Sequence, residues 1–183
     1  MKTIYVFLTT GFEEIEALAT VDVLRRAGLN AKTVSVENST QVVASHRVKV
    51  EADLLFEEAD FSDAALLVLP GGTTRLNEFE ELKKLLLKSY SAGITIAAIC
   101  AAPMVLGGLG LLKGKKATCY PSFEKYLTGA ILATDQPVVT DGSIVTGKGP
   151  AFSLEFALTL VEIAAGKAKR DEVAAGLLAS SAS

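Results

Sequence analysis

Histidine is nearly absent from the 183 residues of this chain, in which His46 is the single example. Mechanisms that use two or more histidines, including those of most zinc enzymes, are therefore not expected. The cysteines and carboxylates show no clustering at metal-ligand spacing, so we predict no bound metal and no other cofactor. Nothing in the sequence places His46 near a reactive group, and we interpret it as a surface-loop residue.

Cysteine is scarce as well, because only Cys100 and Cys119 occur. Two cysteines suit a reducing compartment with independent thiols better than a disulfide framework. The apolar run from Ile4 to Leu8 is too short and too poorly flanked to be a signal peptide. We therefore expect a cytoplasmic protein.

The chain also lacks internal repeats, linkers and any large charge imbalance. Its net charge of -3 gives no reason to expect nucleic acid or an anionic membrane as a partner. Hydrophobic residues make up 50% of the sequence, which is enough to build a sizeable core. The simplest prediction is one domain that spans residues 1–183.

One stretch, Ala92–Leu112, contains no charged residue at all and is long enough to span a bilayer. However, Pro103 and the glycines that follow it would leave backbone groups unpaired in lipid. The rest of the chain is typical of a globular domain. We therefore predict no membrane span here, but a buried strand followed by a helix.

Cys100 lies where this strand meets this helix. Residues 93–99 are a short β-branched run typical of a fully buried strand, and the helical pattern starts at Cys100. A thiol at such a turn indicates a nucleophile elbow, although the glycines of the hydrolase signature are missing. The alternative is a buried structural thiol. The position before a helix N-terminus, where a thiolate would meet free N–H donors, favours a functional thiol of low pKa.

Strand and helix patterns alternate along the rest of the chain. The predicted strands span residues 3–9, 31–36, 64–69, 93–99 and 117–121. One predicted helix begins at Glu14, and three others span residues 78–92, 152–165 and 169–178. The first of these helices has a predicted core-facing stripe of Ile15, Leu18, Ala19, Val21 and Leu24. Residues 41–55 and 138–145 instead predict antiparallel hairpins, the former at the sheet edge or against a second subunit. The alternation predicts an α/β fold.

Two loops contain paired or closely spaced glycines. Gly71 and Gly72 follow a predicted strand, where they either turn backbone N–H groups toward a ligand or form a plain strand-to-helix turn. The segment Gly147-Lys148-Gly149 precedes a predicted helix but lacks the spacing of a phosphate-binding loop, so nucleotide binding is not expected.

Four stretches together resemble the DJ-1/ThiJ/PfpI family, in its DJ-1-like bacterial branch. They are GFEEIE at residues 11–16, VLPGG at 68–72, AAICAAP at 97–103, and the Gly-Pro of 149–150 with SLEFAL at 153–158. The resemblance implies a flavodoxin-like three-layer sandwich with a mostly parallel central sheet, an elbow cysteine and a peripheral β-hairpin. It also implies a homodimer.

The resemblance further implies a site. Cys100 would be the reactive thiol, Glu16 a protonated acid that reaches the sulfur, and the backbone N–H groups of Gly72 and Ala101 the oxyanion donors. This is physically consistent, because a carboxyl buried beside a thiolate keeps its proton. Glu13 and Glu14 are interpreted as solvated acids at the start of the helix.

The sequence departs from the family pattern in two places. Ala101 stands where the peptidase branch has a histidine base, so peptidase activity is not expected. Tyr120 stands before Pro121, where a histidine often occurs in the DJ-1 branch. A tyrosine hydroxyl replaces that histidine only as a weak donor.

Two functional hypotheses of different class follow. In the first, the protein is a redox-responsive stress protein, in which peroxide oxidises Cys100 and Glu16 stabilises the product. In the second, it is a glyoxalase or deglycase that acts on small reactive aldehydes or on glycated and damaged proteins through a Cys100 hemithioacetal. A third possibility is a binding module without activity.

Overall fold

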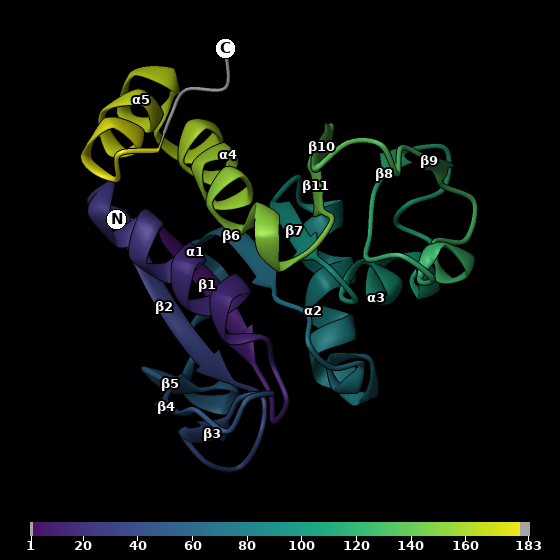
Figure 1. Ribbon diagram of the computed structural model, residues 1–183. Helices are drawn as coiled ribbons and strands as arrows, with labels where there is room; N and C mark the ends of the chain where they lie inside the picture. The colour runs from purple at the N-terminus through teal and green to yellow at the C-terminus, as the bar shows by residue number, and fades with distance from the viewer. Residues whose placement is uncertain (1, 180–183) are drawn as a thin grey trace.

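The computed structural model describes residues 2–179 and has a seven-stranded sheet at its centre (Figure 1). The strand order is β10-β11-β7-β6-β1-β2-β5, and all neighbours are parallel except β10 and β11. The strands of this sheet are β1 (Thr3–Leu8), β2 (Asn30–Ser35), β5 (Leu54–Leu55), β6 (Ala64–Leu69), β7 (Thr95–Ile99), β10 (Val138–Asp141) and β11 (Ile144–Gly147). The predicted α/β fold and mostly parallel sheet are confirmed.

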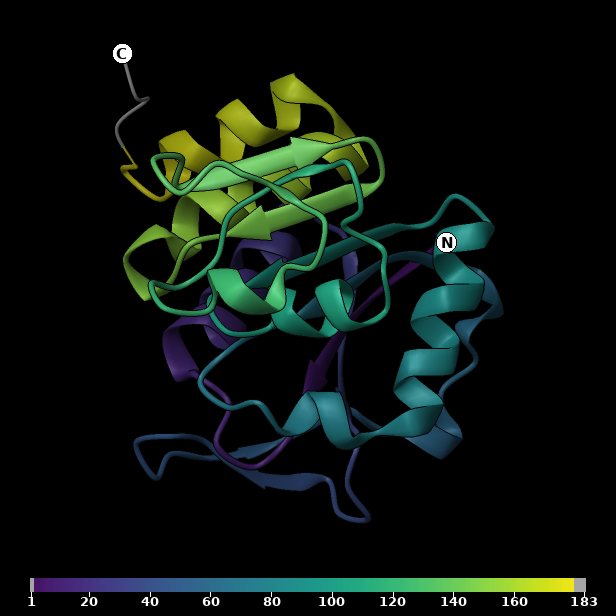
Figure 2. The same ribbon diagram turned by 90° about the vertical axis from the view of Figure 1, so that its right-hand side faces the viewer.

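Helices cover both faces of the sheet and make the predicted three layers (Figures 1 and 2). One face is covered by α1 (Glu14–Arg26), α4 (Ser153–Ala165) and α5 (Lys167–Gly176), and the other by α2 (Glu80–Ser91) and α3 (Pro103–Gly108). Short 3-10 helices complete the chain: η1 (Phe56–Glu58), η2 (Phe61–Asp63), η3 (Arg75–Glu78), η4 (Glu124–Tyr126) and η5 (Pro150–Phe152). No helix among residues 2–179 is both long and apolar enough to cross a membrane.

The order of the parallel strands brings distant segments of sequence together. From β1 the chain proceeds to β2 on one side, whereas β6, β7 and β11 follow on the other side. This reversal makes the β1/β6 boundary the switch point of a flavodoxin-like sheet, and ligands of such sheets bind at the carboxyl ends of the strands there. The segments that leave β1, β6 and its neighbour β7 therefore converge at one edge.

The peripheral hairpin is also confirmed, in the form of a separate two-stranded sheet of β3 (Gln41–Val43) and β4 (Lys49–Glu51). The end of the predicted hairpin segment instead forms β5, which joins the central sheet beside β2. Two backbone hydrogen bonds fasten the hairpin to the loop after β1: Gly11 N–H donates to Val43 C=O (2.7 Å) and Ser45 N–H to Phe12 C=O (2.8 Å).

The predicted core-facing stripe of α1 is partly wrong. Val21 and Leu24 are buried, but Ile15 is 57% and Leu18 37% exposed. The helix turns Glu16 and Thr20 inward instead. Hydrogen bonds of the Thr20 hydroxyl and of one Glu16 carboxyl oxygen make this burial tolerable. The Thr20 hydroxyl donates to Glu16 C=O at 2.7 Å.

The strand predicted at residues 117–121 is also shorter than expected. Only β8 (Lys116–Ala117) forms, paired with β9 (Ile131–Leu132) in a small sheet apart from the central one. The next N–H group, that of Thr118, donates to the Thr146 hydroxyl at 3.0 Å rather than to a neighbouring strand. The sequence also predicts a frayed tail at Ser180–Ser183, and these residues lie outside the described part of the chain.

Candidate active site

Cys100 occupies a strained turn directly after β7. Its φ of +66° lies in the left-handed region, which a residue with a side chain rarely adopts. Hydrogen bonds on both sides hold the turn, since its N–H donates to Gly147 C=O and its C=O accepts from Tyr120 N–H, each at 2.9 Å. The residue is buried, with 8% of its surface exposed. The backbone therefore has the geometry of a nucleophile elbow, although α3 begins at Pro103 rather than at the cysteine itself.

Glu16 is buried in the first turn of α1, where it is 1% exposed. One carboxyl oxygen, Oε2, accepts the N–H of Gly71 at 2.7 Å. Burial raises the pKa of Glu16 to about 7, and the hydrogen bonds from Gly71 and from the Cys100 thiol only partly oppose this effect. The carboxyl is thus a group that gains and loses its proton near neutral pH.

The expected low pKa of Cys100 is wrong for a site in which Glu16 is ionised. Burial raises the pKa of the thiol to about 12, and the negative charge of Glu16 adds to the increase. Backbone hydrogen bonds from Gly72 and Ala101 to the sulfur act in the opposite direction but are weaker. Because the two groups are in contact, the pair carries a single negative charge over a wide pH range. Within the singly charged pair, the thiolate form is the one in which Glu16 holds the proton.

Gly71 and Gly72 fit this site because neither has a side chain. A Cβ at Gly71 would lie 2.7 Å from Cys100 Cβ and 2.9 Å from Glu16 Oε2. Gly72 has a φ of +86°, and a Cβ there would clash with the backbone of Glu13. The loop thereby aims the Gly71 N–H at the carboxyl and the Gly72 N–H at the sulfur. The sequence analysis named both glycines as a possible ligand-binding loop but chose only Gly72 as a donor. The need for glycine at position 71 appears only in three dimensions.

Glu13 and Glu14 are not the solvated acids that the sequence analysis expects. Glu13 is 8% exposed and caps α1, since its carboxylate accepts the Glu16 N–H at 2.8 Å. Its own N–H donates to Gly71 C=O at 2.9 Å, so Glu13 ties the helix start to the glycine loop. A capping acid three residues before a buried one is a sequence signal that identifies this role.

Glu14 points away from the site toward the hairpin. It accepts the N–H of His46 at 2.6 Å and the hydroxyl of Ser45 at 2.9 Å. Although burial opposes the change, hydrogen bonds from His46 and Ser45 lower the pKa of Glu14 to about 2. His46 has 77% of its side chain exposed, which confirms its surface position.

The fold brings ligand atoms of Glu13, Glu14 and His46 within 4.8 Å of one another, which the sequence spacing did not predict. In both carboxylates, however, protein N–H or hydroxyl groups already occupy oxygen atoms. The proximity therefore fits a hydrogen-bonded turn between helix and hairpin.

Tyr120 contacts the elbow through its backbone rather than its hydroxyl. The side chain is 46% exposed, and its ring lies against Gly149, where an added Cβ would be 3.2 Å from Cδ2. Within residues 2–179 its hydroxyl has no hydrogen bond to Cys100 or Glu16. The structure thus gives Tyr120 no direct part in proton transfer.

Comparison with known proteins agrees with this geometry. The family model described as DJ-1/PfpI family matches residues 2–163. The chain belongs to the DJ-1/PfpI family. Among solved structures of the family, Drosophila melanogaster DJ-1beta has a TM-score of 0.93 at 37% identity and covers 98% of this chain and 99% of its own. Toxoplasma gondii DJ-1, described as oxidized, has a TM-score of 0.94 at 34% identity over 99% of this chain and 100% of its own.

Curated relatives extend the comparison to named activities. Protein DJ-1 homolog B of Arabidopsis thaliana is 41% identical over 97% of this chain, but the chain spans only 41% of that relative's length. Deglycase PH1704 of Pyrococcus horikoshii is 33% identical over 79% of this chain and 89% of its own length. Glutathione-independent glyoxalase DJR-1.2 of Caenorhabditis elegans is 32% identical over 88% of this chain and 87% of its own.

Proposed function

We propose that the protein is a DJ-1-type stress-response protein that detoxifies dicarbonyls such as methylglyoxal, free or as early protein adducts, through a hemithioacetal on Cys100. The relatives named as a deglycase and as a glyoxalase support this class of reaction. The observation that carries the proposal is the buried Glu16. Its carboxyl lies beside the Cys100 thiol and has a pKa of about 7. A group that titrates near the working pH is an efficient proton donor and acceptor.

The residues at the site suit each step of such a reaction. The Cys100 sulfur bonds to the aldehyde carbon while Glu16 passes the thiol proton to the carbonyl oxygen. The N–H groups of Gly72 and Ala101, which already point at the sulfur, stabilise that oxygen while it is negative. Glu16 then takes the proton from the aldehyde carbon, which leaves an enediol, and returns it to the neighbouring carbon. The hydroxyl proton moves from the first oxygen to the second in the same step, which gives a lactoyl thioester. Water hydrolyses the thioester to lactate and restores the thiol, so no oxidant is required.

Turnover of methylglyoxal to lactate tests this function. Wild-type protein is expected to show saturable production of lactate, and Cys100→Ala is expected to abolish it. Glu16→Gln, which keeps an acceptor for the Gly71 N–H but does not carry a proton, is expected to lower kcat by about 100-fold or more. Glu155→Gln, an exposed change on α4, is the matched control and keeps full activity. Consumption that stops near one aldehyde per thiol would instead indicate trapping by a nucleophilic cysteine.

Oxidation of Cys100 as a redox response is the second candidate. A relative at 34% identity has been solved in a form described as oxidized, which favours it. Peroxide would transfer one oxygen atom to the sulfur, and water would leave. The raised pKa of the thiol makes this reaction slow, because the thiolate is the nucleophile. Graded peroxide followed by peptide mass spectrometry tests it: Cys100 oxidises before Cys119 if the candidate is right.

A homodimer in the cytoplasm is the assembly and location that we propose. Exposed apolar side chains on α1 and the adjoining hairpin support the dimer: Ile15 (57% exposed), Leu18 (37%), Val43 (37%) and Val48 (45%). Exposed apolar side chains gathered in one place are typical of a contact surface. Sedimentation equilibrium tests the dimer, and Ile15→Glu is expected to shift the protein to monomer.

A further inference from the structure

A second cavity lies apart from the cysteine site. It has a volume of about 470 Å³, and the described residues that line it include neither Cys100 nor Glu16. Its walls come from the carboxyl ends of β2 and β5, from η1, and from the start of α2. The volume is within the range of small-molecule sites, and the carboxyl edge of a parallel sheet is where such sites commonly occur.

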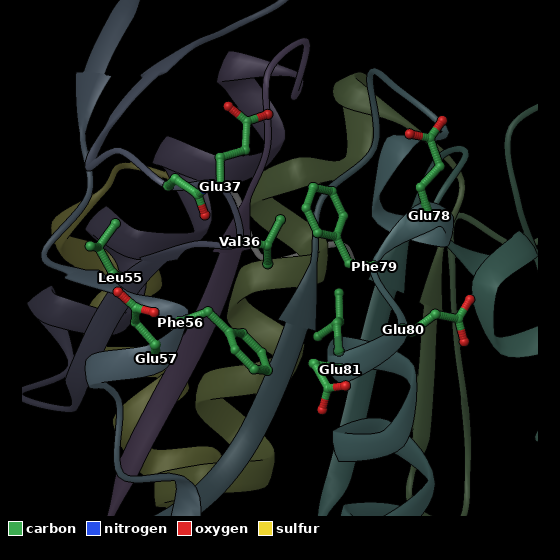
Figure 3. A pocket seen from close by; sticks show the side chains of 11 residues that line it. Val36, Glu37, Leu55, Phe56, Glu57, Glu78, Phe79, Glu80 and Glu81 are labelled. Atoms are coloured by element: carbon green, nitrogen blue, oxygen red, sulfur yellow. The ribbon is translucent and has the colours of Figure 1, made fainter.

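The cavity has an apolar floor. Figure 3 shows Val36, Phe56 and Phe79 directed into the space between the two walls. Leu55 and Leu82 also line it. The two phenylalanines provide aromatic faces, which attract both apolar groups and organic cations.

The rim of the cavity is acidic. Five glutamates line it, namely Glu37, Glu57, Glu78, Glu80 and Glu81, and none of the described lining residues is lysine or arginine. Three of the five have a partner elsewhere: Glu80 pairs with Lys83 and Glu81 with Lys84, each at 2.7 Å, and Glu37 lies 3.6 Å from Arg75. This charge distribution disfavours an anionic ligand.

The remaining two carboxylates have no such partner. Within residues 2–179, Glu57 and Glu78 form neither an ion pair nor a side-chain hydrogen bond. They lie on opposite walls, Glu57 on η1 and Glu78 on η3, with the aromatic floor between them (Figure 3).

We propose that this cavity binds a small organic cation, an amine with an apolar aliphatic or aromatic body. The ammonium group would be attracted to Glu57 and Glu78, while the body would cover the floor of Val36, Phe56 and Phe79. Charge and shape complement each other here, since the apolar floor takes the body and the two open carboxylates at the exposed rim attract a cation.

Three probes with the same phenylalkyl body test the proposal: 4-phenylbutylamine, 4-phenylbutanol and 4-phenylbutyrate, titrated into the protein and followed by amide chemical shifts. The amine is expected to bind saturably with shifts at Phe56, Phe79 and Leu82, the alcohol about tenfold more weakly, and the acid not at all. Glu57→Gln combined with Glu78→Gln is expected to weaken the amine about tenfold and to leave the alcohol unchanged. Glu51→Gln, an exposed change on β4, is the matched control.

Other results would overturn the proposal. Equal binding of amine and alcohol, or equal binding of the amine to wild type and the double variant, would remove the role of the carboxylates. Tighter binding of a lysine-rich peptide than of the amine would make the cavity part of a protein-docking surface instead. The readout needs neither turnover nor Cys100, because the same titration applies to Cys100→Ala protein. Failure here is therefore distinguishable from failure of the proposed reaction.

Discussion

Two glutamates on opposite faces of the first turn of α1 have pKa values shifted in opposite directions. Glu16 on the inner face has a pKa raised to about 7, whereas Glu14, two residues earlier, has a pKa lowered to about 2. Burial raises the pKa of both carboxyls. Two things differ. Glu16 is buried more deeply, with 1% exposed against 12% of the Glu14 side chain, and Glu14 has more donors, namely the N–H of His46 and the hydroxyl of Ser45 in addition to its own backbone.

This contrast shows how a fold selects one acid for chemistry among several. A carboxylate that is fully supplied with donors stays ionised and structural. A buried carboxyl with a single backbone donor, and with one oxygen, Oε1, that has no hydrogen-bond partner within residues 2–179, keeps its proton to neutral pH. The Cys100 thiol also donates to this carboxyl and lowers its pKa, whereas the charge of Glu13 raises it.

The pH dependence of stability gives the largest expected effect. Between the unfolded pKa of 4.5 and the folded pKa of about 7, native Glu16 holds a proton that the unfolded chain has released. The native state therefore loses stability as pH rises through this window, by about 3 kcal/mol in total. Urea unfolding of wild type and Glu16→Gln at pH 5 and pH 8 measures it. The variant is expected to be the more stable protein at pH 8, with little difference at pH 5.

If the free energy of unfolding had the same pH dependence in wild type and in Glu16→Gln, Glu16 would not be the cause of the loss of stability. Glu155→Gln is the carboxylate-to-amide control, because Glu155 is exposed on α4 and is expected to leave the slope unchanged.

Gly71→Ala tests the comparison of Glu16 with Glu14, because it displaces the backbone N–H that donates to Glu16. The added Cβ would lie 2.7 Å from Cys100 Cβ and 2.9 Å from the N of Ala101, so the loop must shift. We expect a loss of about 1–3 kcal/mol in the free energy of unfolding and a large loss of lactate production. Gly108→Ala is the control, since nothing lies within 4 Å of its added Cβ. Wild-type activity in Gly71→Ala would show that the loop does not position the site.

Glu13→Ala removes the cap that fastens the start of α1. The Glu16 N–H loses its acceptor, and the expected cost is about 1 kcal/mol of stability. Glu13→Gln keeps a carbonyl oxygen at the cap and is expected to recover most of that loss. Thermal unfolding measures both, and the pH profile of activity shows whether the Glu16 carboxyl has moved. Equal melting temperatures for Glu13→Ala and wild type would contradict the capping role.

His46→Ala gives the smallest expected effect and acts on the outer face alone. Without the His46 imidazole, the pKa of Glu14 is expected to rise from about 2 toward 4.5, although the backbone N–H at position 46 remains. Since a lowered carboxyl pKa stabilises the native state above the unfolded pKa, the variant loses a small amount of stability at neutral pH and less at pH 2. Carboxyl carbon NMR reports the Glu14 pKa. A change in the Glu16 pKa would contradict the expectation that the substitution acts on Glu14 alone.

Much of the fold followed from the sequence. The apolar runs at residues 64–69 and 93–99 predicted buried parallel strands because both of their faces had to be covered, and both predictions were right. The core-facing stripe of α1 was partly wrong because hydrophobicity favoured Ile15 and Leu18 over Glu16. The partner that makes a buried glutamate tolerable, Gly71, is 55 residues away in the chain.

The sequence by itself therefore determined the alternation of strands and helices and the position of a thiol at a strand end. Both depend on local patterns of apolar residues and turns. Only the tertiary structure decided that Glu16 is the acid with few hydrogen-bond donors, that position 71 must be glycine, and that five glutamates line an apolar cavity. These features arise where segments distant in the chain meet at the edge of the sheet, and the pKa of a group depends on all the neighbours that folding brings to it.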